Sequence, residues 1–159
     1  MNRHVPRRLA LVLMAGLCAA GVLLAVAGRG PVQAAPAGTS LYARLGGYDA
    51  IAAVVDDFIG RLATDPQFQK FFVGHSQDSI HRIRQLIVDQ FCQVTGGPCA
   101  YTGRDMKTAH KGLGITEADW NASVKHLIAS LDKFKVPEKE KGELLAIAGK
   151  LKDDIVEKR

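Results

Sequence analysis

The chain has 159 residues, of which 47% are apolar, 23% are charged and 6% are aromatic. That length permits a single domain with an appendage, and the composition excludes a disordered chain, a collagen-like repeat and a disulfide-dense miniprotein. The formal net charge is +5, but Arg3, Arg7, Arg8 and Arg29 lie in a 34-residue N-terminal segment that holds no acidic residue. The remainder is nearly balanced, with 17 basic and 16 acidic residues. We therefore expect no nucleic-acid partner.

An uncharged apolar run of 19 residues extends from Leu9 to Ala27, directly after the basic N-terminus. Small residues follow it, and Val32 and Ala34 suit a cleavage site after Ala34. This arrangement is typical of a secretory signal peptide and predicts export to the periplasm or the extracellular space. The run is also long enough to cross a bilayer, so a retained transmembrane anchor at residues 9–27 is the alternative, and the membrane is expected as a partner only through it. The expected organisation is a signal peptide or anchor at 1–34, a linker at 35–39 and one domain at 40–159.

From Ser40 onward, apolar residues recur at helical spacing without an alternating strand pattern, which predicts an all-α domain. A first helix is expected within residues 46–65, with Asp49 as its N-cap. A second helix is expected after Asp78 or Ser79 and ends at the GGP at 96–98, and a short helical turn is expected at 105–111. The next helix is expected after a cap formed by Thr116 and Asp119. The last is expected from Pro137 onward as one helix that contains Leu144, Ala148, Leu151 and Ile155.

The common phosphate-binding, dinucleotide-binding, zinc-protease and serine-hydrolase motifs are absent from the sequence. A CxxCH motif for covalent haem attachment is also absent. Cys92 and Cys99 have six residues between them, which is not a zinc-site spacing. In an exported protein this pair can form a disulfide across the GGP turn, and the alternative is two small buried residues.

Four histidines lie in the body of the chain, at positions 75, 81, 110 and 126. Most histidines are surface residues or satisfied core residues, but His110 differs in its surroundings. The short helix places it on the same side as Met106 and Leu113, in an apolar domain that also supplies Phe58, Phe72, Phe91 and Trp120. A neutral imidazole facing an apolar slot is what a haem iron requires on one side. Aromatic residues and methionines at helical spacing are otherwise explained as ordinary core.

Seven segments together resemble the group I truncated haemoglobins in order and spacing. They are SLYARLGG at 40–47, VVDDF at 54–58, DPQFQKFF at 65–72, GGP at 96–98, YTGRDMKTAH at 101–110, GLGIT at 112–116 and VPEKE at 136–140. The resemblance covers nearly all of residues 40–156. It implies a globin of the two-over-two helical type, with a sandwich of helices around a non-covalent b-type haem.

The same resemblance implies the site residues. His110 matches the proximal ligand of the haem iron, and Phe72 matches the phenylalanine that stacks on the haem. The expected haem contacts are Phe58, Ile59, Phe72, Ile83, Ile87, Phe91, Met106, His110, Leu113, Ile115, Trp120 and Val124.

The distal side departs from the family pattern. Many relatives present a tyrosine to bound oxygen where this chain has Ile59, and the segment between Phe72 and Gly96 is about three residues longer than in common relatives. Alignment from GGP predicts that Ile83 and Ile87 face the iron. Alignment from Phe72 instead brings His81 or Arg84 near it, and Gln85 is a third polar residue that could turn toward bound oxygen.

The resemblance implies a haem protein that binds O2 and other diatomics such as NO and CO. Enzymatic oxidation of nitric oxide, with electrons from an unidentified reductase, is the first alternative to non-enzymatic oxygen binding. Haem-based redox chemistry or gas sensing is a second alternative. A cofactor-free helical interaction module is the hypothesis from a different class.

Overall fold

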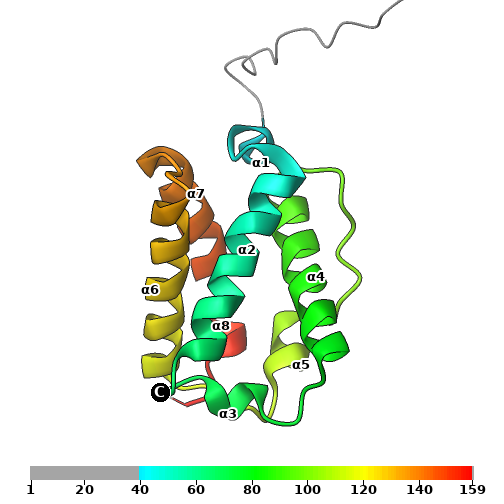
Figure 1. Cartoon of the computed structure of the whole chain (residues 1–159), viewed down its shortest axis with the longest axis vertical. Coiled ribbons are helices and arrows are strands. Elements are labelled where there is room, and N and C mark those ends of the chain that lie inside the picture. Colours follow the sequence, from blue (N-terminus) through cyan, green and yellow to red (C-terminus); the bar gives the residue numbers. More distant parts are fainter. Residues whose placement is uncertain (1–39, 159) are drawn as a thin grey trace, which may run out of the picture. The chain divides into compact units, whose positions relative to one another are not determined.

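The computed structural model describes residues 40–158 (Figure 1). The predicted signal peptide or anchor and the predicted linker lie outside this range. Within it the regular structure is helical, apart from one isolated parallel bridge between Thr116 and Lys158. The all-α prediction is therefore confirmed. None of the helices in this range is long and apolar enough to cross a membrane.

Residues 40–158 form eight helices, three of which are long and carry most of the core. In chain order they are α1 (Leu41–Arg44), α2 (Gly47–Thr64), α3 (Gln69–Phe72), α4 (Gln77–Val94), α5 (Met106–His110), α6 (Glu117–Lys133), α7 (Glu138–Gly149) and α8 (Lys152–Ile155).

Helix α2 is central, because it contacts both α4 and α6 (Figure 1). Val55 on α2 and Val88 on α4 are fully buried, and Leu131 on α6 is 1% exposed. Helix α7 adds Leu144 and Ala148 to the same cluster and also contacts α1 and α6. Full burial of each large aliphatic side chain contributes about 1.5–3 kcal/mol, so this cluster holds α2, α4, α6 and α7 together.

Polar side chains define the starts of three helices. Ser76 accepts a hydrogen bond from the backbone of Ser79 at α4, and Asp105 accepts one from the backbone of Thr108 at α5. Thr116 forms a reciprocal capping box with Asp119 at α6, as the sequence predicted. These bonds satisfy backbone N–H groups that have no partner inside a helix.

Three predicted helix boundaries are wrong. The N-cap of α2 is Gly46, and Asp49 instead lies in the first turn, where its charge is favourable at a helix N-terminus. Helix α4 begins earlier than expected, at Gln77, because Ser76 provides the cap. The last helix is interrupted after Gly149, where the next two backbone N–H groups bond to carbonyls three residues back. Such bonds tighten and end an α-helix.

The two cysteines of the described chain are bonded to each other. Cys92 lies in the last turn of α4 and is fully buried, while Cys99 lies in the loop that follows the GGP turn. Their Cα atoms are 5.7 Å apart, which is the usual spacing for a disulfide. Of the two alternatives that the sequence left open, the structure has the disulfide.

Candidate functional site

The position of His110 follows from the short helix α5. Its Nδ1 lies 2.8 Å from the backbone oxygen of Met106, one turn earlier. A carbonyl oxygen only accepts hydrogen bonds, so Nδ1 carries the proton and donates it. The lone pair is therefore on Nε2, which has no hydrogen-bond partner among residues 40–158. This is the tautomer of a metal-ligating histidine whose second nitrogen is fixed by the protein.

The other histidines have different settings. His126 places Nε2 2.7 Å from a carboxylate oxygen of Asp65, and its ring packs edge-on against Phe68. His75 and His81 are exposed. No group of three or more metal-ligating side chains occurs in the described part of the chain. A lone imidazole fits a metal that brings its other ligands with it, as the iron of a porphyrin does.

Helix α4 carries an apolar face formed by Ile80, Ile83 and Ile87 at helical spacing. Ile80 and Ile87 are half-buried against the core, whereas Ile83 is 37% exposed. Leu113, three residues after His110, is 45% exposed. Large apolar side chains that the protein itself leaves uncovered suit an apolar cofactor, so these residues fit a haem.

Two of the three polar distal candidates are engaged elsewhere. Arg84 donates two hydrogen bonds to the carboxylate of Asp56 on α2, over 2.7 and 2.9 Å. The bonds from Arg84 hold the pKa of Asp56 below its usual value. Gln85 donates to the hydroxyl of Tyr48 on α2 and to Asp89 on α4. Both side chains are thus committed to α2 or to their own helix.

The remaining predicted contact residues differ in burial. Ile59 and Phe91 are each 8% exposed and belong to the central core, against which Phe58 and Phe72 are half-buried. Four more predicted contact residues, which lie on α5 or after it in the chain, are also half-buried: Met106, Ile115, Trp120 and Val124. Trp120 and Val124 are one turn apart and therefore share a face of α6.

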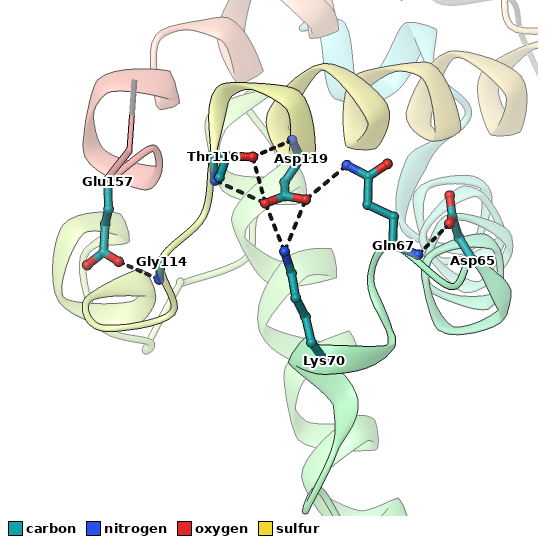
Figure 2. Close-up of polar contacts among 7 residues, drawn as sticks. All are labelled: Asp65, Gln67, Lys70, Gly114, Thr116, Asp119 and Glu157. Atoms are coloured by element: carbon teal, nitrogen blue, oxygen red, sulfur yellow. Dashed lines mark hydrogen bonds and ion pairs between the residues drawn. The ribbon is translucent and has the colours of Figure 1, made fainter.

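A polar cluster around Asp119 joins the segment at α3 to the start of α6 (Figure 2). Asp119 is 3% exposed and accepts hydrogen bonds from Gln67 at 2.9 Å, from Lys70 at 3.2 Å and from the hydroxyl and backbone of Thr116. Burial alone would raise the pKa of Asp119, but these hydrogen bonds outweigh it and hold the pKa well below its usual range. The sequence predicted Asp119 only as a cap and missed its contacts with α3.

Three comparisons with known proteins agree. A family model described as bacterial-like globin matches residues 40–157. The group 1 truncated haemoglobin GlbN of Mycolicibacterium paratuberculosis is 35% identical over 116 residues, which are 73% of this chain and 83% of that protein.

Two solved structures extend the likeness to the fold. A 2/2 haemoglobin from Synechococcus, in the cyanomet state and with covalently attached haem, has a TM-score of 0.68 at 27% identity. The truncated haemoglobin of Tetrahymena pyriformis in its Fe(III) form has a TM-score of 0.67 at 26% identity. Each comparison covers 74% of this chain and 98% of the other.

Proposed function

Because the chain belongs to the bacterial-like globin family and to the group 1 truncated haemoglobins, with haem iron as cofactor and gas binding as the shared function, we propose that His110 ligates the iron and that O2 is the principal gas. Bound haem supplies an iron atom with one coordination position for a diatomic gas. The protein supplies the imidazole on one side, the apolar surroundings and the control of access.

The tautomer of His110 carries this proposal. The 2.8 Å hydrogen bond from Nδ1 to Met106 fixes the tautomer and the orientation of the ring, as such bonds do for metal-ligating histidines. His126 is the only other half-buried histidine of residues 40–158, and its Nε2 is bonded to Asp65. His126 is thus tied through Nε2 to Asp65 at the end of α2, whereas the Nε2 of His110 has no hydrogen-bond partner among residues 40–158.

We further propose that Ile59, Ile83 and Ile87 form the distal side, as the alignment from GGP implies. The commitment of Arg84 to Asp56 and of Gln85 to Tyr48 supports this choice over the alignment from Phe72. Isoleucine side chains have no hydrogen-bond donor. The distal side would then exclude water and hold O2 without a hydrogen bond from the protein.

Export of the chain is a second proposal. The Cys92–Cys99 disulfide supports it, because disulfides persist in oxidising compartments outside the cytoplasm. Fractionation of cells that express the full chain tests it: the protein should be recovered outside the cytoplasm, and recovery in the cytoplasm with two free thiols at these cysteines would contradict it.

Visible spectroscopy tests the haem proposal. The full chain titrated with haemin should develop an intense Soret band that saturates at one haem per chain, and the reduced form should bind O2, CO and NO. His110→Ala should lose most of the bound haem, whereas His126→Ala is the matched control and should retain it. A His110→Ala variant with full haem content and unchanged reduced and CO spectra would contradict the assignment. A full chain that develops no Soret band would be explained by the cofactor-free interaction module instead.

A further inference from the structure

The C-terminal residues after α8 lie along the segment that follows α5. The backbone N–H groups of Glu157 and Lys158 both donate to the oxygen of Ile115, over 2.9 and 3.1 Å. The N–H of Glu117 donates in turn to the oxygen of Lys158 over 3.1 Å, so the two segments form the isolated parallel bridge. Glu157 and Lys158 are thereby fixed against the loop between α5 and α6.

The Glu157 carboxylate adds a second connection to this loop. One of its oxygens accepts a hydrogen bond from the N–H of Gly112 at 2.6 Å, and the other accepts one from Gly114 at 2.5 Å; Figure 2 shows the bond to Gly114. Both glycines have positive φ angles, +85° and +65°, which a side chain rarely adopts. Left-handed glycines allow nearby N–H groups to converge on one anion. Glu157 therefore occupies an anion-binding turn of this chain's own backbone.

This turn begins two residues after His110. The N–H of Leu113 bonds to the oxygen of His110 at 3.2 Å, so the loop folds back on the end of α5. Helix α5 has only five residues, and a helix that short does not hold its own geometry. Its N-terminal end is held by the Asp105 cap, and its C-terminal end is followed directly by the turn that Glu157 binds.

We propose that Glu157 is a positioning residue for His110. By holding Gly112 and Gly114, its carboxylate sets the place of the C-terminal end of α5 and so the direction in which the His110 ring presents Nε2. This inference rests on the proposed role of His110 as the iron ligand. In this account Glu157 acts on His110 mainly through the loop, and its charge also interacts electrostatically with the His110 ring.

Three variants of the full, haem-loaded chain test the inference. Glu157→Ala removes both acceptors, Glu157→Gln keeps one carbonyl oxygen, and Glu138→Ala removes an exposed carboxylate bonded to Lys141 on α7 as the matched control. The first measurement is the rate of haem loss to excess apomyoglobin. The second is the iron–histidine stretching band of the reduced protein in resonance Raman spectra.

We expect Glu157→Ala to lose haem about tenfold faster than the wild type, equivalent to ~1.4 kcal/mol, and its iron–histidine band to shift or broaden. Glu157→Gln should be intermediate, and Glu138→Ala should match the wild type. A general loss of stability would speed haem loss but leave the band of the folded protein in place. The band therefore separates positioning from a merely structural role.

If the iron–histidine band of Glu157→Ala is unchanged, the inference is overturned. This holds whether the variant loses haem at the wild-type rate or faster. If Glu157→Ala does not fold by circular dichroism, the same criteria apply to Glu157→Gln. Failure of the proposed function has a different result, because the wild type would then show no iron–histidine band or His110→Ala would retain it.

Discussion

Helices α4 and α5 carry the residues expected on opposite sides of the haem, and they are held in place in opposite ways. Helix α4 has 18 residues and a fully buried Val88, so its own backbone hydrogen bonds and its packing on α2 fix it. Helix α5 has five residues, none of them buried. Its geometry comes from outside, through Asp105, the loop bound by Glu157 and the start of α6 fixed by Asp119.

This difference would allow a short helix to present the iron ligand that we propose. Helix nucleation is unfavourable and a single turn is marginal alone, so polar bonds from outside the helix, from the adjacent Asp105 and from the distant Glu157, must replace the missing helical turns. Those bonds are charge-assisted, which makes them stronger than neutral ones. On α4, Arg84 and Gln85 instead bond to α2, which directs these two donors away from the apolar face.

The largest expected effect is on stability and concerns Asp119, which fixes the start of α6 after the loop that follows α5. Asp119→Ala removes the cap of α6 and the link to Lys70 and Gln67 together, and we expect the free energy of unfolding to fall by about 3 kcal/mol. Denaturant unfolding at neutral pH measures this change. The control is Asp132→Ala, an exposed acid paired with Lys141, for which less than about 1 kcal/mol is expected. Equal losses in the two variants would contradict the account.

Acid unfolding sharpens the same point. The pKa of Asp119 is lowered in the folded chain, so its ionised form contributes stability above the unfolded value near 3.8. That contribution is lost as the pH falls below about 4 toward the folded pKa. Asp119→Asn should therefore lower stability at pH 7 and flatten its decline on the acid side. If the stability of Asp119→Asn declines with acid as steeply as that of the wild type, other carboxyl groups cause the acid unfolding.

Reduction of the disulfide is the next largest effect and acts at the end of α4. The loop closed by Cys92 and Cys99 is short, and the chain-entropy relation gives about 2.5 kcal/mol for its closure. Unfolding in the presence of a reductant should show a loss of this size. Thiol counting on denatured, unreduced protein checks the bond itself: no free thiol should be found at these two cysteines.

The donor-free distal side predicts a smaller change in gas binding. Ile59→Tyr introduces a hydroxyl that can donate a hydrogen bond, and we expect O2 dissociation to slow about tenfold, equivalent to ~1.4 kcal/mol. CO dissociation should change much less. Ile59→Phe is the matched control, since it adds the ring without the hydroxyl. A wild type that already releases O2 as slowly as Ile59→Tyr would indicate a native donor.

The smallest effect is expected from Arg84→Ala. Its guanidinium is bonded to Asp56 near the surface, so we expect a loss of less than about 1 kcal/mol in stability and less than about twofold change in O2 dissociation. Stopped-flow measurement of O2 release checks this. Release that is faster by about tenfold or more would identify Arg84 as a distal donor and would reverse the contrast between α4 and α5.

The sequence predicted the long helices because their apolar residues repeat over many turns. Four-residue helices such as α1 and α3 carry too few repeats to be recognised, and the break after Gly149 was hidden by apolar residues that continue across it. The Thr116 and Asp119 cap was predictable, since both groups lie within one turn. Glu157 was not, because the glycines that it binds lie more than 40 residues away.

The same distinction applies to the candidate site. His110 was singled out by local sequence and by family resemblance, and the Met106 carbonyl that accepts its hydrogen bond lies only four residues away. The distal register depended on an insertion between Phe72 and Gly96, where local patterns allowed two alignments. The structure contributes the tertiary bonds of Arg84 and Gln85, which favour the isoleucine alignment.

Imidazole rescue tests the central claim, that His110 is the ligand that this chain provides to iron. Resonance Raman spectra of the reduced wild type should show an iron–histidine stretching band. His110→Gly should lack that band, and added imidazole should restore it by occupying the space left by the side chain. A His110→Gly variant that keeps the wild-type band without imidazole would contradict the claim and point to another histidine.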